Sequence, residues 1–317
     1  MKFPGMVFAE GIEEFIRTAD EAFPPDFSSL SLDQQRACYA KLCQAFETDR
    51  PKTVAVVDQT IELEDRSIGL RIYRPHRSDP GPSPCLLYFH GGGFIFGNLD
   101  SHDGVTAELA EQTGALVIAV DYRLAPEHRH PCASEDSWAA LQWLWSSADA
   151  LAVDPTRIVA AGDSAGGNLA MGLAFRARSQ PRPPLAGVVL IYPGLGLCLA
   201  DPDHPTGPDA PGLTAAEMDY YKDLYLGEGG AWDDPRAFPL FETDYAGLPP
   251  VYVQAAALDP LAQDGQALAA RIRAAGGDCE SEVFAGLIHG HLRARRLVPQ
   301  AAQAFRAALA AVRRFIR

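Results

Sequence analysis

The stretch RIVAAGDSAGGNL, residues 157–169, decides the fold. Arg157 to Ala161 form a run typical of a buried strand, and a helix-period segment begins near Ala165. Between them, residues 162–166 fit the pattern G-x-S-x-G, in which glycines leave room for a very sharp strand-to-helix turn. Such a turn holds its serine in strained backbone at the top of a sheet, beside a helix N-terminus. The setting between strand and helix therefore predicts an exposed Ser164 hydroxyl.

Short apolar runs recur on both sides of this turn and alternate with helix-period segments. The strands expected after residue 84, each apolar on both faces, are 85–89, 115–120, 157–161, 186–191, 251–256 and 280–284. The helices expected among and after them are 103–113, 135–148, 165–178, 262–275 and 299–316. Strands of this kind are covered by helices on both sides, as in parallel sheets. The alternation predicts a doubly wound, mostly parallel α/β sheet with right-handed crossovers.

Two more strands and two helical segments complete the expected architecture. Residues 53–63 and 68–74 alternate around a charged turn at 64–66 and predict a hairpin, which makes an eight-stranded sheet. Residues 1–50 show helical spacing without a strand signal, and residues 195–240 form a long insertion that contains an amphipathic stretch at 213–226. We expect 1–50 and 195–240 to pack together as a helical cap over a core made of 51–194 and 241–317.

Composition excludes several classes of protein. The chain has 317 residues, of which 47% are hydrophobic and 21% charged, so it is neither a disordered chain nor a coiled coil. The 27 basic and 41 acidic residues give a net charge of −14, which repels phosphate backbones, and we expect no nucleic-acid partner.

Localisation signals and cysteine usage point to the cytoplasm. No stretch reaches about 18 uninterrupted apolar residues, so we expect no membrane insertion. The first 17 residues lack the build of a signal peptide. The six cysteines form no C-x-x-C pair and are expected to be reduced thiols: Cys38, Cys43, Cys85, Cys132, Cys198 and Cys279.

A second glycine-rich segment, His90-Gly91-Gly92-Gly93-Phe94, directly follows the expected strand 85–89. Consecutive glycines let the backbone approach a reacting carbonyl closely and aim N–H donors at the oxyanion that forms there. A tight turn or a phosphate cradle is the alternative interpretation. The chain contains neither G-x-x-x-x-G-K-[ST] nor a G-x-G-x-x-G that opens a helix, which disfavours the cradle.

Three motifs, in this order and spacing, closely resemble those of the hormone-sensitive-lipase-like family of α/β-hydrolases. They are the segments at 90–94, 121–127 (DYRLAPE) and 162–169 (GDSAGGNL). The form with Asp before the serine is similar to the GDSAG branch of bacterial carboxylesterases. The likeness runs from about Leu70 to the C-terminus, whereas residues 1–50 resemble the family's cap in position only. The resemblance implies the α/β-hydrolase fold and a serine carboxylesterase acting on short- to medium-chain esters of small molecules, without cofactor or metal.

The acid of the expected catalytic triad comes after the serine in this fold, and the histidine follows it. Asp259 follows the run 251–256 in an Asp-Pro-Leu element, as the family's acid does. Asp244, before that run, and Asp264, in the following helix, are competitors. The family more often has Asp-Glu-Gly where this chain reads Gln263-Asp264-Gly265.

The histidine of the triad matches His289, which follows the last expected strand. The family's element there is His-Gly-Phe, and in this chain His291 replaces the Phe, which leaves two histidines as candidates. We expect Ser164 to attack an acyl carbonyl, His289 to accept its proton, and Asp259 to orient the imidazole. The backbone N–H groups of Gly92, Gly93 and Ala165 are expected to form the oxyanion hole, by resemblance and because the residue after the nucleophile contributes one donor.

Several other residues receive weaker interpretations. His128 and His130, and the segment with Asp201, Asp203 and His204, lack metal-ligand spacing and are expected on surface loops. His90 is expected to orient the glycine loop, and Glu127 and Asp136 to hold structure around the sheet edge.

The C-terminal segment has seven arginines and no acid after His291. A solvated helix face is the expectation, and a membrane-surface or homodimer contact is the alternative.

Two other functions stay open besides the carboxylesterase. One is hydrolysis of a different acyl bond: a lactone, amide, carbamate or sugar acetyl ester. The other is a ligand-binding receptor on the same scaffold, like the gibberellin receptors, which resemble this family but lack the catalytic histidine. The presence of His289 favours an enzyme.

Overall fold

The computed structural model describes residues 3, 5–24, 26–76, 81–196 and 206–317. Within these residues the chain forms one eight-stranded sheet in the order β1-β2-β4-β3-β5-β6-β7-β8. The strands are β1 (Val54–Glu62), β2 (Ser67–Pro75), β3 (Ser83–Phe89), β4 (Leu116–Asp121), β5 (Val153–Asp163), β6 (Gly187–Ile191), β7 (Val251–Ala256) and β8 (Cys279–Phe284). Strands β1 and β2 form the expected hairpin, β2 pairs antiparallel with β4, and all other pairs are parallel. The predicted fold class is confirmed.

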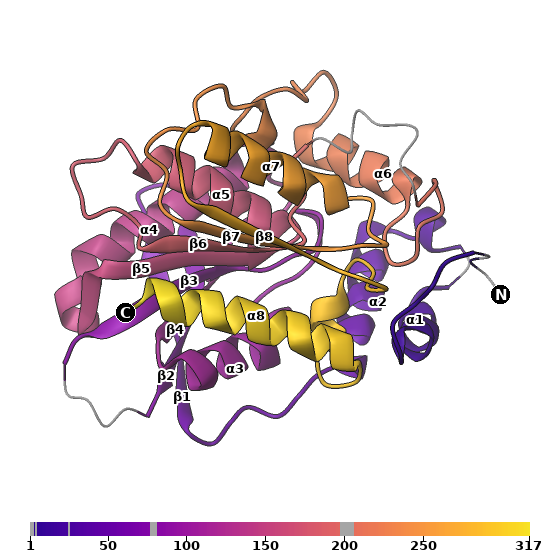
Figure 1. The fold of residues 1–317 in the computed structure, drawn as a ribbon, viewed down its shortest axis with the longest axis horizontal. Coiled ribbons are helices and arrows are strands. Elements are labelled where there is room, and N and C mark those ends of the chain that lie inside the picture. Colours follow the sequence, from indigo (N-terminus) through magenta and orange to yellow (C-terminus); the bar gives the residue numbers. More distant parts are fainter. Residues whose placement is uncertain (1–2, 4, 25, 77–80, 197–205) are drawn as a thin grey trace.

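Helices cover both faces of the sheet (Figure 1). One face carries α4 (Cys132–Leu151), α5 (Ala165–Ala177) and α7 (Ala262–Ala274), and the other carries α3 (Asp103–Thr113) and α8 (Pro299–Phe315). Because side chains alternate along a strand, Leu87 and Phe89 of β3 pack toward the first layer, and Leu86 and Tyr88 toward the second. All four are buried, as expected of a parallel strand between two helical layers.

Strand β8 differs from the expectation that every strand after residue 84 is apolar on both faces. It is the last strand of the sheet and has a partner only in β7. Glu280 is exposed, and Val283 is 46% exposed. The expectation is wrong here because an edge strand is incompletely covered and its sequence includes polar residues that reach water.

The C-terminal arginines mostly contact the chain itself. Arg295 and Arg296 both pair with Glu108, and Arg314 pairs with Glu280. Arg293 and Arg313 donate to the carbonyl oxygens of Ser101 and Gln112. Five of the seven arginines therefore have intramolecular partners, which supports a solvated face on a packed segment.

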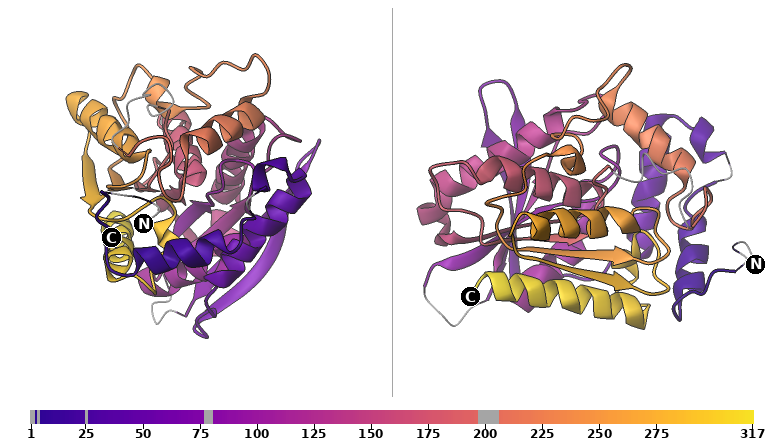
Figure 2. Two further views of the ribbon diagram at one scale, coloured as in Figure 1. Left: turned by 90° about the vertical axis from the view of Figure 1, so that its right-hand side faces the viewer. Right: turned by 45° about the horizontal axis from the view of Figure 1, so that its top comes forward.

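Three helices lie together at one end of the molecule (Figures 1 and 2): α1 (Ile12–Asp20), α2 (Leu32–Ala45) and α6 (Ala215–Leu226). Helix α6 lies within the expected amphipathic stretch, and Thr214 and Glu217 form a capping box at its N-terminus. The Tyr220 hydroxyl of α6 donates to Gln35 Oε1 of α2 at 3.2 Å, so the N-terminal segment and the insertion are in contact. These helices and the residues that follow β3, β5 and β6 line one cavity.

Candidate active site

The turn between β5 and α5 holds Ser164 in an unusual backbone conformation, with φ 53° and ψ −119°. A positive φ is uncommon for a residue with a side chain, and surrounding contacts must enforce it. A Cβ on Gly166 would lie 1.9 Å from the carbonyl oxygen of Phe89, and one on Gly162 would lie 2.3 Å from the backbone of Gly166. The glycines thus permit the close approach of β3, β5 and α5 that presents the serine to the cavity.

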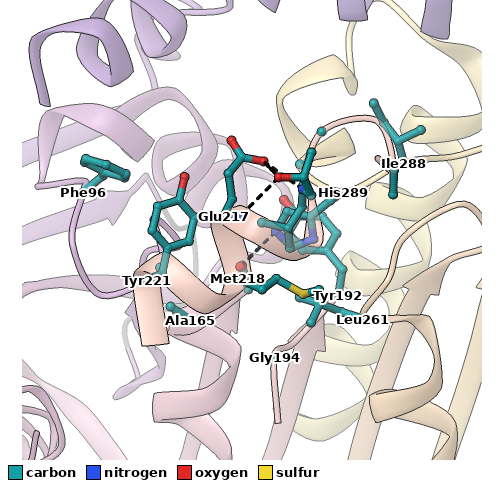
Figure 3. A pocket seen from close by; sticks show the side chains of 18 of the residues that line it. Phe96, Ala165, Tyr192, Gly194, Glu217, Met218, Tyr221, Leu261, Ile288 and His289 are labelled. Carbon is teal, nitrogen blue, oxygen red and sulfur yellow. Dashed lines mark hydrogen bonds between the residues drawn. The ribbon is translucent and has the colours of Figure 1, made fainter. Parts of the chain in front are cut away.

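Ser164, His289 and Asp259 form a continuous hydrogen-bonded chain. His289 Nε2 lies 3.0 Å from Ser164 Oγ, and His289 Nδ1 lies 2.7 Å from Asp259 Oδ2. Asp259 is fully buried, and its Oδ1 accepts the N–H of Leu261 at 2.8 Å. Figure 3 shows His289 within the cavity. This arrangement can carry a proton from the serine hydroxyl to the imidazole while the carboxylate fixes the ring's orientation.

The environment of His289 favours its protonated form. Burial lowers the pKa of an imidazole, but the charge of Asp259 and its hydrogen bond outweigh burial and raise the pKa of His289 above its ordinary value. The imidazolium that would form during attack by Ser164 is stabilised in the same way.

The competing residues lie elsewhere. Asp264 is buried and accepts the backbone N–H groups of Leu195 and Gly196, so it holds the loop after β6. Asp244 is exposed and lies beside Arg178.

The second candidate histidine, His291, is buried, and its Nδ1 lies 3.1 Å from the Ile288 carbonyl oxygen. Burial lowers the pKa of His291 to about 4. The structure therefore brings Asp259 and His289, and none of the three competitors, to Ser164.

The expected oxyanion donors face the same cavity as the serine. Gly92, Gly93 and Ala165 line it, and in the described part of the chain their backbone N–H groups donate no hydrogen bond. Ala165 is the first residue of α5, where backbone N–H groups lack partners within the helix. Three backbone donors that line the cavity with Ser164 therefore have no partner among the described residues.

Asp163 links the serine turn to the glycine loop, a role that sequence reasoning missed. It is buried and accepts the Tyr88 hydroxyl at 2.7 Å and the Gly91 N–H at 3.0 Å, with His102 Nε2 at 3.3 Å. Burial raises the pKa of a carboxyl group, but His102 and the Tyr88 hydroxyl outweigh it and hold the pKa of Asp163 well below its usual range. Its place directly before Ser164 was the only sequence signal.

His90 lies at the start of the glycine loop and is not among the residues that line the cavity with Ser164. Its Nδ1 is 2.9 Å from the Gly91 carbonyl oxygen, and its ring stacks on Tyr122 with centroids 4.4 Å apart. The Tyr122 hydroxyl also donates to the His90 carbonyl oxygen at 2.7 Å. Burial lowers the pKa of His90 to about 3, so the ring is neutral at neutral pH. This geometry fits the expected orienting role.

Helices α2 and α6 hold the far end of the glycine loop. Arg36 of α2 donates to the carbonyl oxygens of Ile95 and Ala125, both at 3.1 Å, and forms a bidentate ion pair with Glu127. Tyr225 of α6 stacks on Phe94 with centroids 3.8 Å apart. Glu127 therefore has the structural role expected of it.

Asp136 also has the structural role expected of it. Its carboxylate is fully buried and accepts hydrogen bonds from both Arg66 and Arg123.

The cavity has a volume of about 790 Å³ and is mostly apolar. Figure 3 shows Phe96, Met218, Tyr221 and Ile288 among the side chains that line the cavity together with His289. The charged residues that line it are Asp20, Asp163, Asp209, Glu217, Lys222 and Arg293. The sequence contains no signal for this lining, because its members come from segments far apart in the chain.

The weaker metal interpretation finds no support in the part of the chain that the structure covers. No group of three or more His, Cys, Asp or Glu side chains there could hold a metal ion. His130 instead contacts Tyr225 and Asp234. Asp201, Asp203 and His204 lie outside the described residues.

Among the helices described, none has the length and apolar character needed to cross a membrane.

Comparison with known proteins identifies the class. The pattern of the family described as the alpha/beta hydrolase fold matches residues 86–293, and the chain belongs to this family. It is 34% identical to the carboxylesterase NlhH of Mycobacterium tuberculosis over 96% of each chain. It is 39% identical to the esterase LipI of the same organism over 81% of each chain.

A solved structure agrees with these relatives. The hyperthermophilic esterase from the archaeon Pyrobaculum calidifontis superposes with a TM-score of 0.88 at 32% identity, covering 97% of this chain and 98% of that one. The predicted family and the predicted assignment to the hydrolase enzymes are confirmed.

Proposed function

We propose that this protein is a serine carboxylesterase that hydrolyses short- to medium-chain acyl esters of small molecules. The observation that carries the proposal is the chain of contacts from Asp259 through His289 to Ser164, at 2.7 and 3.0 Å, in a mostly apolar cavity. The enzyme class, carboxylic ester hydrolase, agrees with the names of the relatives reported above.

In the first half of the proposed reaction, Ser164 Oγ attacks the acyl carbonyl carbon and His289 Nε2 takes its proton. The negative charge that develops on the carbonyl oxygen is received by the N–H groups of Gly92, Gly93 and Ala165. Collapse of this tetrahedral intermediate breaks the ester bond, and His289 returns the proton to the leaving alcohol. The acyl group stays on Ser164.

In the second half, water attacks the acyl-enzyme while His289 takes its proton; the second collapse breaks the bond to Ser164 Oγ, His289 returns the proton to that oxygen, and the carboxylic acid leaves. The Asp259 carboxylate stabilises each imidazolium. These steps balance without a cofactor or metal ion.

The proposal also covers the cap over the site, the location of the protein in the cell and its oligomeric state. Residues 1–50 and 195–240 are assigned to a cap, supported by α1, α2 and α6 lining the cavity. A cytoplasmic location is supported by free thiols at the five described cysteines, Cys38, Cys43, Cys85, Cys132 and Cys279; Cys198 lies outside the described residues. A homodimer stays a prediction.

Hydrolysis of p-nitrophenyl esters from acetate to palmitate tests the function. At about pH 8 without added metal, the wild type should prefer a short or medium chain, and Ser164→Ala should lose about 10⁴-fold or more of kcat/KM. Circular dichroism confirms that both proteins are folded. Activity retained by Ser164→Ala would contradict the proposal. A folded wild type that hydrolyses none of these esters would favour the receptor or another acyl bond.

A further inference from the structure

Glu217 is a carboxylate in the cavity that has no cationic partner. It lies in the first turn of α6, where its Oε2 accepts both the N–H and the hydroxyl of Thr214, at 2.8 and 2.7 Å. Among the described residues, no group donates a hydrogen bond to its Oε1, and no Lys or Arg forms an ion pair with Glu217. One carboxylate oxygen is therefore left for a ligand.

The position of Glu217 relates it to the reacting groups. It lines the same cavity as Ser164 and His289, and its side chain appears with that of His289 in Figure 3. Its charge is also among those that raise the pKa of His289, after the effects of burial, Asp259 and Asp163. A charged group on a bound ester would consequently lie within electrostatic range of Glu217.

The two cations that line the cavity, Lys222 and Arg293, make their described hydrogen bonds to groups other than Glu217. Lys222 pairs with Asp219 at 2.7 Å. Arg293 donates to the Ser101 carbonyl oxygen and the Tyr39 hydroxyl. The N-terminus of α6 supplies at most about half a positive charge, so it offsets the carboxylate only in part.

Aromatic side chains in the cavity are a second, independent feature that favours a cationic ligand. Tyr221 of α6 and Phe96 of the glycine loop both line the cavity, with ring centroids 5.6 Å apart in an edge-to-face arrangement. Aromatic faces attract cations, and such rings recur where proteins bind quaternary ammonium groups. An acid without a counter-ion beside aromatic rings suits a cationic group better than a neutral one.

We propose that Glu217 is a specificity-determining residue that makes the site favour small esters bearing a quaternary or protonated amine and disfavour esters bearing a carboxylate. The inference rests on the proposed esterase function and deepens it by naming the substrate class. In a partly buried cavity, the attraction between two unit charges is several times stronger than in water, so one carboxylate is sufficient to select by charge.

A pair of esters that differ by one atom tests this. Choline butyrate carries a quaternary nitrogen where 3,3-dimethylbutyl butyrate carries a carbon, so kcat/KM for the two compares a cation with its neutral isostere. A second pair places the same change in the acyl group: the p-nitrophenyl esters of trimethylammonioacetate and 3,3-dimethylbutanoate. Glu217→Gln removes the charge but keeps the capping box, because glutamine also serves at that position.

We expect Glu217→Gln to lower the cation-to-neutral ratio of kcat/KM by about ten-fold in at least one pair. That factor corresponds to unit charges about 6 Å apart at an effective dielectric constant of about 40. Asp223→Asn is the matched control, because it removes an exposed acid of the same helix that does not line the cavity. Its ratios should stay within about two-fold of the wild type, since exposed charges are screened.

Ratios for Glu217→Gln equal to those of the wild type in both pairs would overturn the inference. An equal fall in Asp223→Asn would overturn it as well, because the effect would then come from the net charge of the helix. If the wild type hydrolyses the neutral esters but Glu217→Gln leaves both ratios unchanged, this inference fails and the proposed function stands. A wild type silent toward every neutral ester overturns the function and this inference together.

Discussion

His289 lies between a buried carboxylate and a serine hydroxyl, and in the proposed mechanism its protonation state decides when the serine can be activated. Only the neutral imidazole can accept the Ser164 proton. Because Asp259 raises the pKa of His289 above its ordinary value of about 6.5, the protonated form persists to higher pH than in a free imidazole. If the proposed mechanism holds, Asp259, which stabilises the imidazolium during the reaction, also makes the resting enzyme inactive in mild acid.

The expected consequence is an acid limb in the pH profile of kcat/KM. As pH falls through the raised pKa, His289 becomes protonated, and the rate should drop about ten-fold per pH unit below a midpoint above about 6.5. The measurement uses a neutral ester from about pH 5 to about pH 9, with stability followed in parallel. A profile that stays flat down to about pH 4 would contradict the role of His289.

At the scale of the element, helix α5 contains glycines with opposite roles. Gly166, in its first turn, approaches the carbonyl oxygen of Phe89 too closely for any side chain. Gly172, farther along the same helix, has no atom within 4 Å of the position where a Cβ would lie. Glycine is therefore required at the first position and merely tolerated at the second.

Alanine substitution should separate these two glycines. Gly166→Ala forces the β3–α5 contact apart and should lower the free energy of unfolding by at least about 2 kcal/mol. Gly172→Ala should raise it by about 0.5–1 kcal/mol, because alanine loses less backbone entropy in a helix interior. Urea denaturation followed by circular dichroism measures both. Similar stabilities for the two variants would show that the turn is less tightly packed than the contacts indicate.

At the scale of the whole molecule, the cavity lies between the ends of the sheet strands and helices from distant parts of the chain. Ala19 of α1, Met218 of α6 and Ser164 after β5 all line it. Its length and width are consequently set by how α1 and α6 pack, and the acyl chain that fits should respond to residues far in sequence from the reacting serine.

Filling the cavity from α1 should shorten the preferred acyl chain. Ala19→Trp adds a large side chain to the lining and should lower kcat/KM for octanoate at least about ten-fold relative to acetate, since a lost apolar contact of one or two methylenes is worth that much. Glu14→Trp, on the exposed surface of the same helix, is the control and should leave the ratio unchanged. If Ala19→Trp lowers kcat/KM equally for the octanoate and acetate esters, the acyl chain does not bind beside α1.

Local patterns were sufficient to predict most of the fold and the central part of the candidate site. The eight strands and the helices follow from apolar runs and their spacing, since burial between layers leaves a direct mark on the residues involved. The turn at Ser164 is equally local, because Gly162 and Gly166 must admit neighbouring backbone. Strand β8 was predicted as a strand, but its burial was predicted wrongly, because its polar residues Glu280, Ser281 and Glu282 reach water only through its place at the sheet edge.

The sequence by itself determined the class of fold and predicted the chemistry, since the expected nucleophile, glycine loop, acid and histidine each follow a strand in a recognisable motif. Only the tertiary structure decided between Asp259 and Asp264, and between His289 and His291, because that choice is a matter of distances between separate loops. It also revealed the contacts that Asp163 makes with the glycine loop and the place of Glu217 in the cavity. The physical reason is that the tertiary contacts of a side chain depend on how distant segments pack. Whether a residue lies in a helix or a strand depends largely on its neighbours in the chain.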